Sequence, residues 1–476
     1  MKITLIEPQA PGKHVFSSVK MPRLGLPILG TILKKEGHQV ELIFASRAKI
    51  KLSQLTDSDL LAISTITSTA PEAYCLADLA RAQGIPVIMG GPHVTFLAEE
   101  ALAHCDYVCR GEGDLTFLQL VNCIERGEIP REVPGVSYRL GDEIIHNPSP
   151  DWVDVNEVPI PDFDLLKDMG LSTYPVMASR GCPYDCTFCS VTPMFGHKFR
   201  CRSQASMLEE LKEYRGRKVF FVDDNFTASP RRTRELLQQM LQEKLTPRWW
   251  CAQVRTDAAR DEELLRLMRD SGCGTVFVGM ESINPATLEN YNKHQEVSDI
   301  EYCIRQFHRY GMMVHGMFVF GSDKDTAQTI RDTLDFALKN HIDTVQFLIL
   351  TPLPGTRVFQ EMEAAGQIFT HDWELYDAHH VVYTPRLMSA EELQRETIQA
   401  FRRFYSLRHL FANLFITGFR SVAFRAVGFW LVRKWERDNR WFYRFLRHGF
   451  KEDGSSPSAR RPKWTRSTRN YGVIGE

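Results

Sequence analysis

Three cysteines, Cys182, Cys186 and Cys189, stand in a C-x3-C-x2-C spacing, whereas the other cysteines of this 476-residue chain are scattered. Three thiolates on one short loop can bind one metal cluster. A [4Fe–4S] cluster takes one thiolate on each iron, so three cysteines leave one iron free to bind another molecule. The spacing therefore predicts an iron–sulfur site that does chemistry.

Structural zinc binding is the alternative for these cysteines. Zinc sites of this kind normally use four ligands in paired knuckles, and Cys201 or His197 is near enough in the sequence to supply a fourth. The N-terminus, MKITLIEP, has no cleavage-site pattern of a signal peptide, so ligands and buried thiols are expected here before disulfides. We keep a non-enzymatic zinc protein as an alternative reading.

The cysteine loop must be positioned by residues 173–385, in which short apolar strands alternate with helices. Strands are predicted at 174–180, 218–224, 248–255, 275–281, 313–321 and 344–350. This rhythm predicts a partial or full parallel β/α barrel, a (β/α)6 arrangement, whose functional groups gather at the carboxyl ends of the strands. The candidate residues at or near those ends are Asp223, Asp224, Arg255, Glu281, Gly316 and Gly321.

Residues 1–140 show the same alternation, with strands predicted at 2–8, 39–44, 60–65, 86–91 and 106–111. This pattern predicts an α/β domain with a doubly wound parallel sheet, which binds ligands at the carboxyl ends of its strands. Small hydroxyls and glycines at those ends allow close approach of a ligand. Residues 141–172, rich in proline and acidic residues, are expected to form an extended linker. The candidate binding residues are Ser64, Thr67, Gly90, Gly91, His93 and Glu112.

The cysteine loop behind the first barrel strand, together with the N-terminal sheet, resembles the cobalamin-binding-domain-containing radical S-adenosylmethionine (SAM) superfamily. That group includes methyltransferases, the anaerobic Mg-protoporphyrin ester cyclase and hopanoid-lipid enzymes. The resemblance covers about residues 1–385 and implies a [4Fe–4S] cluster held by the three cysteines. It implies that the open iron binds SAM, and that reductive cleavage of SAM yields a 5′-deoxyadenosyl radical that abstracts hydrogen from an unactivated carbon.

The resemblance also implies roles for residues near the cysteines. Phe188 resembles the aromatic residue that packs near the adenine of SAM. Asp223 and Asp224 stand where many members keep a Gly-Gly-Glu motif that holds the SAM amine, so this chain departs from that motif. Glu281 resembles the group that contacts the ribose or methionine part of SAM.

Further along the barrel, Gly316 to Gly321 resemble the glycine-spaced element that flanks adenine. Arg255 could pair with the SAM carboxylate, because a guanidinium fits a carboxylate through two parallel hydrogen bonds. The alternative for Arg255 and Asp223 is a structural salt bridge inside the barrel mouth.

Cobalamin is the second cofactor that the resemblance implies. Many cobalamin domains carry a D-x-H-x-x-G pattern whose histidine binds cobalt, but Phe44-Ala45-Ser46-Arg47-Ala48-Lys49 follows the second strand here. His93 lies elsewhere and is not that ligand. Cobalamin therefore either binds without a protein histidine or has been lost. With cobalamin we expect C-methylation, and without it carbon-skeleton coupling, cyclisation or rearrangement.

Residues 386–452 are helical, aromatic and basic, and residues 453–476 form a tail that is expected to be disordered. A basic, aromatic, amphipathic helix can lie in a membrane interface. The alternative is a helix packed on the barrel with its arginines in solvent. This segment, with the hopanoid-type resemblance, predicts a hydrophobic or lipid-like substrate and peripheral membrane contact. In 410–432 the polar residues that share one arc of the helix are Asn413, Thr417, Arg420, Ser421 and Arg425.

Composition limits the other classes of protein. The 58 Lys and Arg residues balance 59 Asp and Glu residues, which gives no support to bulk nucleic-acid binding. No apolar stretch is long enough to predict a membrane-spanning helix. We therefore expect a cytoplasmic enzyme, associated with a membrane if its C-terminal helices bind lipid. It would act on a small molecule and take electrons from a donor such as flavodoxin or ferredoxin.

Overall fold

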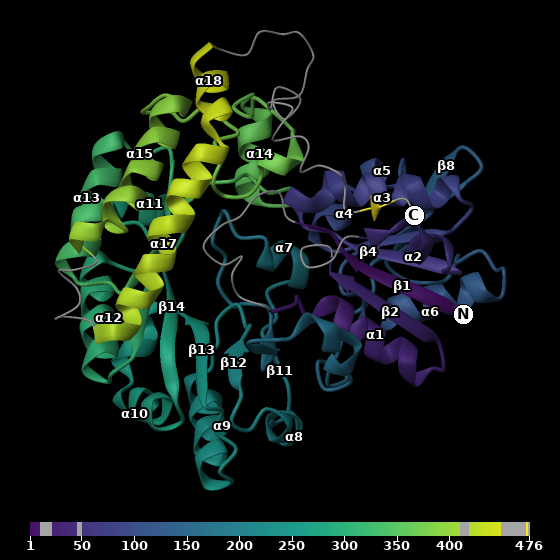
Figure 1. Cartoon of the computed structure of the whole chain (residues 1–476), viewed down its shortest axis with the longest axis horizontal. Coiled ribbons are helices and arrows are strands. Elements are labelled where there is room, and N and C mark those ends of the chain that lie inside the picture. The colour runs from purple at the N-terminus through teal and green to yellow at the C-terminus, as the bar shows by residue number, and fades with distance from the viewer. Residues whose placement is uncertain (10–20, 45–49, 410–417, 449–472, 475–476) are drawn as a thin grey trace.

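The computed structural model describes residues 1–9, 21–44, 50–409, 418–448 and 473–474 (Figure 1). Asn413, Thr417 and the stretch 45–49 after the second strand lie outside the described residues. So does most of the tail that is predicted to be disordered. Its described part, β17 (Val473–Ile474), pairs in parallel with β3 (Ile50–Lys51) of the N-terminal domain.

The N-terminal domain is a doubly wound sheet whose described strands run in the order β2-β1-β4-β5-β6-β7-β8. The strands from β2 to β6 are parallel, and β7 and β8 are antiparallel at the edge. They are β1 (Lys2–Glu7), β2 (Gln39–Phe44), β4 (Leu60–Ser64), β5 (Val87–Gly90), β6 (Tyr107–Cys109), β7 (Val136–Leu140) and β8 (Glu143–His146). The domain boundary predicted at residue 140 is wrong, because β8 continues the sheet into the segment expected to be a linker.

Two hydrophobic clusters cover the two faces of this sheet. Successive side chains of a strand point to opposite faces, and accordingly Leu61 and Ile63 join one cluster whereas Leu60 and Ala62 join the other. The first cluster packs under α3 (Ala70–Ala82), α4 (Pro92–Phe96) and α5 (Ala98–Ala101), and the second under α1 (Gly25–Lys35) and α6 (Gly113–Glu125). Helices on both faces make the domain α/β, as predicted.

The second domain is an open parallel sheet in which each described strand lies beside its predecessor in the chain, in the order β16-β15-β14-β13-β12-β9. The strands are β9 (Tyr174–Val176), β12 (Lys218–Phe221), β13 (Trp249–Val254), β14 (Cys273–Glu281), β15 (Met313–Phe320) and β16 (Thr344–Ile349). The helices between them are α8 (Gln204–Glu213), α9 (Pro230–Gln242), α10 (Glu262–Asp270), α11 (Pro285–Asn290), α12 (Val297–Arg309) and α13 (Ala327–Lys339). This is the predicted partial barrel.

Local sequence explains where these helices begin. Asp261 caps α10 by accepting a hydrogen bond from the backbone N–H of Leu264, and Thr326 caps α13 in the same way at Thr329. The apolar residues of α10 then recur on one face, which buries Leu264, Leu265 and Met268 against the sheet.

The C-terminal helices are part of the barrel core. They are α15 (Ala390–Phe404), α17 (Gly418–Asp438) and α18 (Arg440–His448), after α14 (Arg357–Ala364). Tyr405 binds the edge strand β16 with its hydroxyl, which accepts from the Val345 N–H at 3.0 Å and donates to the Val345 carbonyl at 2.8 Å. Trp435, Trp441 and Phe442 are buried in the same hydrophobic cluster as the barrel strands.

The length and polarity of the helices decide whether any of them could span a bilayer. Within the described ranges, every helix is too short or too polar to cross a membrane.

Candidate active site

The carboxyl ends of the two sheets face each other. Phe96, after β5, packs so tightly on Gly355, after β16, that a Cβ atom there would lie 2.5 Å from its ring. Trp373, in the same region of the barrel, donates a hydrogen bond to Glu100 of the N-terminal domain at 3.0 Å. The carboxyl ends of parallel strands are where both fold types bind ligands. The structure therefore brings the two predicted binding edges to one interface.

A buried group of ion pairs, which we call the interdomain ion-pair cluster, joins Glu112 and Asp114 of the N-terminal domain to Arg180 and Arg200 of the barrel. Glu112 accepts hydrogen bonds from Arg200 at 2.7 and 2.5 Å and from the Val153 N–H at 3.0 Å. Asp114 accepts two hydrogen bonds from Arg180, at 2.6 and 3.1 Å. The side chain of Glu112 is only 1% exposed. Glu112, expected to bind a cofactor, instead joins the two domains.

The cysteine loop lies directly beside this cluster, between β10 (Ser179–Arg180) and α7 (Val191–Phe195). Burial raises the pKa of all three thiols. The pKa of Cys189 reaches about 12, mainly through burial and in smaller part through the nearby Cys186 and Cys182. The three thiols therefore share one electrostatic environment. Cys201, on β11 (Arg200–Cys201), has its pKa shifted by burial and then by Arg232 and Asp223, so it belongs to different surroundings.

The chemistry of this loop fits a metal cluster. Within the described ranges, no three side chains of His, Cys, Asp or Glu are already gathered as a metal site. Three thiols on one short loop match the three protein ligands of a [4Fe–4S] cluster with one open iron, and metal binding deprotonates them. Two cations are close enough to offset the charge of the thiolates. Burial is the largest influence on the pKa of Cys186 and raises it, whereas Lys293 and Arg255 lower it.

The segment after α11 holds the cysteine loop in place. Thr187 donates its backbone N–H to the Tyr291 carbonyl at 3.2 Å, and Asn292 donates its side-chain amide to the Asp185 carbonyl at 3.0 Å. The Phe188 ring, expected near adenine, packs edge-on against Tyr291 with ring centroids 4.9 Å apart. These contacts fix the loop from the side opposite to the N-terminal domain.

Lys293 is a charged residue of the site that was not predicted, because candidates were chosen at the carboxyl ends of strands and Lys293 lies in the turn between α11 and α12. Its ammonium group contacts the Glu281 carboxylate at 2.7 Å, and both side chains are almost fully buried. Glu281, expected to contact SAM, is therefore paired within the chain. The run of polar residues from Asn292 to Gln295 is the only feature of the sequence that could have indicated a functional residue in this turn.

Arg255 is buried without a carboxylate partner among the described residues. It donates to the Lys293 carbonyl at 2.7 Å, and its guanidinium carbon lies 3.7 Å from the Tyr184 ring centroid. Its buried Nε has no hydrogen-bond partner in the described structure. Among the described residues Arg255 therefore forms no salt bridge, and the arrangement fits a carboxylate that comes from a bound molecule.

The two adjacent aspartates have different surroundings. Asp223 accepts hydrogen bonds from the Ala178 N–H, at 3.1 Å, and from the Ser179 hydroxyl. These two hydrogen bonds stabilise the turn after β9. Burial raises the pKa of Asp223 to about 7. Asp224 is exposed, and it is close enough to Cys182 and Cys189 to raise their pKa values. Asp224 is the one that faces the cysteine loop.

The two barrel glycines are placed by packing. A Cβ atom on Gly316 would meet Met280 at 3.2 Å. Gly321 has a φ of +102°, and a Cβ atom there would lie 2.1 Å from the hydroxyl of Tyr383, which donates to the Gly321 carbonyl at 2.5 Å. In the described structure, the missing Cβ atoms of these glycines leave room for the side chains of Met280 and Tyr383.

The candidate cobalamin edge is built from backbone and small hydroxyls. Ser64 and Gly90 are register partners at the ends of β4 and β5. Gly91 has a φ of +102°, and its missing Cβ leaves room for the Thr65 carbonyl, which a Cβ would approach to 2.3 Å. Thr67 follows in a buried 3-10 turn, η2 (Thr67–Thr69). This composition fits a large ligand that is bound mainly through hydrogen bonds and close backbone approach.

His93 has a different place from the one expected for a cofactor ligand. It is fully buried, with Nε2 at 3.1 Å from the Tyr74 hydroxyl and 3.4 Å from Glu100, and its ring packs edge-on against Trp373. His93 thus helps to join α4 to the barrel.

Comparison with known proteins agrees with this architecture. Residues 17–121 match the family model of the B12 binding domain, and residues 176–337 match that of the radical SAM superfamily. The chain is 32% identical to an uncharacterised methyltransferase of Pyrococcus horikoshii, over 85% of this chain and 92% of the relative. It is 30% identical to the bacteriochlorophyllide d C-12(1)-methyltransferase of Chlorobaculum tepidum, over 85% and 87%.

A solved structure shares the fold of both domains. The radical SAM methyltransferase TsrM of Kitasatospora setae, with cobalamin and a [4Fe–4S] cluster bound, superposes with a TM-score of 0.70 at 17% identity, over 92% of this chain and all of that one. The alternative of a non-enzymatic zinc protein is therefore wrong. The chain belongs to the cobalamin-dependent radical SAM methyltransferase family, with a [4Fe–4S] cluster, SAM and cobalamin as its cofactors.

Proposed function

We propose that this protein transfers a methyl group to a carbon atom of a hydrophobic, lipid-like small molecule. The observation that carries the proposal is the opposition of the two strand edges, which places the predicted cobalamin edge across from the cysteine loop. The interdomain ion-pair cluster holds this arrangement, because Arg180 stands two residues before Cys182 and binds Asp114 at 2.6 Å. Substrate would bind between the two edges.

Each cluster-facing side chain has a proposed task. Cys182, Cys186 and Cys189 would hold the iron–sulfur cluster, which supplies one electron for the cleavage of SAM when it is bound. Arg255 would bind the SAM carboxylate, and Asp224 would accept a hydrogen bond from the SAM amine. Lys293 would offset thiolate charge beside Cys186, and Phe188 would pack near adenine.

The N-terminal domain would bind cobalamin through Ser64, Thr67, Gly90 and Gly91. His93 is engaged with Tyr74, Glu100 and Trp373, so we propose that no histidine of this loop ligates cobalt. A low-potential donor such as flavodoxin or ferredoxin would deliver electrons. The lipid-like character of the substrate is supported by the aromatic C-terminal helices, and we expect the enzyme to work at a membrane surface.

Anaerobic reconstitution tests the methylation proposal. Protein loaded with iron, sulfide and hydroxocobalamin is incubated with dithionite, a lipid extract and SAM that carries a deuterated methyl group. We expect a retained corrinoid spectrum, formation of S-adenosylhomocysteine and a deuterated methyl group in a lipid-soluble product. Formation of 5′-deoxyadenosine with no labelled product and no retained corrinoid would instead support coupling, cyclisation or rearrangement without cobalamin.

Arg255 allows a test of the SAM site by itself. Arg255→Lys keeps the charge but loses the planar fork, so we expect the KM for SAM to rise roughly 10- to 100-fold, because a charge-assisted hydrogen bond contributes about 1.5–3 kcal/mol. The measurement is 5′-deoxyadenosine formation against SAM concentration. Arg248→Lys, at an exposed arginine before β13, is the matched control and should leave the KM unchanged. Equal KM values for both variants would remove Arg255 from the SAM site.

A further inference from the structure

Helix α17 presents three large apolar side chains to solvent, although Leu431, Val432 and Trp435 of the same helix are buried. Phe424, Val427 and Trp430 are 53%, 44% and 55% exposed, whereas Ser421 and Arg425 are 0% and 1% exposed. A helix that covers the core of a water-soluble domain normally turns its apolar stripe inward. The alternative of a helix packed on the barrel with its arginines in solvent holds for Arg437, which is exposed, but not for Arg425.

The buried side of α17 is fixed by specific polar contacts. Arg425 donates from Nε to the Asp343 carbonyl at 2.8 Å and from Nη2 to the Ile342 carbonyl at 2.5 Å. Its guanidinium also lies over the Phe404 ring, 4.4 Å from the centroid. Rotation of the apolar stripe into the core would leave these buried carbonyls unpaired, which is costly. The outward orientation is therefore built into the fold.

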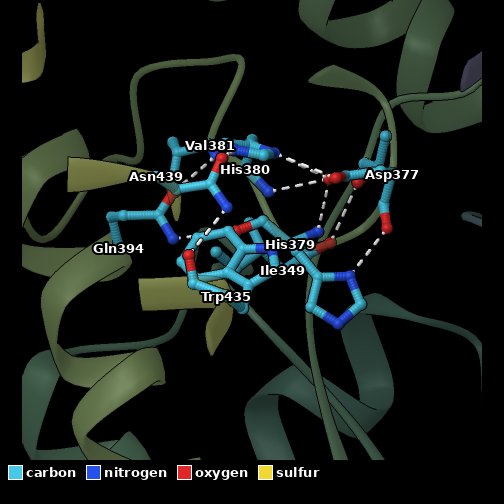
Figure 2. Close-up of polar contacts among 9 residues, drawn as sticks. Ile349, Asp377, His379, His380, Val381, Gln394, Trp435 and Asn439 are labelled. Atoms are coloured by element: carbon cyan, nitrogen blue, oxygen red, sulfur yellow. Dashed lines mark hydrogen bonds and ion pairs between the residues drawn. The ribbon is translucent and has the colours of Figure 1, made fainter. Parts of the chain in front are cut away.

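The C-terminal end of α17 is anchored at the barrel mouth, as Figure 2 shows. His380 has Nδ1 at 3.0 Å from the Asp377 carboxylate and Nε2 at 3.0 Å from the Asn439 side-chain oxygen. Burial alone would raise the pKa of Asp377, but the neighbouring His380 and His379 lower it to about 2. The Ile349 N–H, at the carboxyl end of β16, donates to the Ala378 carbonyl at 2.8 Å. The apolar stripe thus lies on a helix that ends beside the candidate active site.

The helix that follows α17 carries exposed arginines. Arg440, Arg444 and Arg447 of α18 are exposed. Arg447 pairs with Glu391, but Arg440 and Arg444 form no ion pair with any described residue. Apolar side chains followed by exposed guanidinium groups complement a bilayer interface with anionic headgroups.

We propose that α17 and α18 form the membrane-docking surface of this enzyme. Phe424, Val427 and Trp430 enter the interface of an anionic phospholipid bilayer, and Arg440 and Arg444 contact its headgroups. Docking by this surface holds the enzyme at the bilayer in which a hydrophobic substrate is dissolved. Docking needs no SAM, so a test without SAM succeeds or fails independently of the methylation proposal.

Vesicle flotation of the full-length protein with its cofactors tests this docking. We expect the protein to float with vesicles of phosphatidylcholine and phosphatidylglycerol, and less with phosphatidylcholine alone. Phe424→Glu/Trp430→Glu should reduce flotation at least about tenfold, because charged side chains are expelled from the interface. Arg440→Gln/Arg444→Gln should lose the preference for anionic vesicles. The matched control is Leu79→Glu/Leu115→Glu, which alters two exposed leucines of the N-terminal domain, 37% and 45% exposed, and should float as the unchanged protein does.

Two further readouts distinguish other occupants of the stripe. If wild type forms a dimer in sedimentation velocity that Phe424→Glu/Trp430→Glu disrupts, and neither protein floats, a second copy covers the stripe and the proposal is overturned. The fluorescence difference between wild type and Trp430→Phe reports the surroundings of Trp430, and a blue shift on adding vesicles is expected. An emission that is already blue without vesicles and unchanged by them would show that the chain itself covers Trp430, which also overturns the proposal.

Discussion

Serine in place of Cys182, Cys186 or Cys189 is expected to reduce SAM cleavage by more than about a thousandfold, which corresponds to a barrier increase above about 4 kcal/mol. Each thiol is half-buried on one loop; Cys186 raises the pKa of Cys182 and of Cys189, and Cys182 raises that of Cys189. No second thiol stands ready to replace a lost one, because the pKa of Cys201 responds to Arg232 and Asp223 instead. Each single change should therefore remove an iron ligand that nothing nearby supplies.

Cys201→Ser is the matched control for these three variants, since Cys201 is also a half-buried thiol near the same loop. It should retain full iron and sulfide content and normal 5′-deoxyadenosine formation. Iron analysis and electron paramagnetic resonance of the reduced protein measure the cluster, and product analysis measures the cleavage. Retention of a complete cluster in any one of the three variants, or its loss in Cys201→Ser, would show that the ligand set is different.

The strands and their order could be predicted because buried parallel strands have a simple signature. Each predicted barrel strand overlaps an observed strand; 218–224 and 313–321, for example, contain β12 and β15. Strands covered on both faces appear as short continuous apolar runs, and helices between them supply the crossovers. The edge hairpin of β7 and β8 was missed because its strands are short and lie next to a segment rich in proline and acidic residues.

The partners of the site residues could not be predicted, because they depend on contacts between distant parts of the chain. Glu112 stands after a strand, as a binding residue would, yet its partner Arg200 is 88 residues away. Lys293 reaches Glu281 from a turn that no periodic pattern marks. For α17 the amphipathic pattern was visible, but a pattern does not say which of its two faces the fold buries.

Loss of Glu112 is expected to have the second large effect. Its carboxylate binds Arg200, Arg180 and the Val153 N–H at the interface of the two domains. Glu112→Ala removes one partner of a buried pair and leaves the Arg200 guanidinium without its charge partner, which should lower the free energy of unfolding by about 3–5 kcal/mol. Urea denaturation measures this loss.

An exposed ion pair supplies the control for Glu112. Asp57 pairs with Lys2 at the surface and is 74% exposed, so Asp57→Ala should lower the free energy of unfolding by less than about 1 kcal/mol. A double-mutant cycle with Arg200→Ala isolates the contribution of the pair, because alanine at both positions no longer leaves Arg200 buried and unpaired. A Glu112→Ala cost as small as that of Asp57→Ala would show that the cluster does not hold the domains together.

The same variant separates positioning from simple stability. If the interdomain ion-pair cluster sets the distance between the cobalamin edge and the cysteine loop, its loss should affect methyl transfer more than SAM cleavage. Because Arg180 binds Asp114 as well as Glu112, Glu112→Ala leaves the cysteine loop attached at one point while the Arg200 attachment is released. We expect 5′-deoxyadenosine formation to continue while the yield of methylated product per cleavage falls several-fold. An unchanged ratio of the two products, measured well below the unfolding transition, would restrict Glu112 to a structural role.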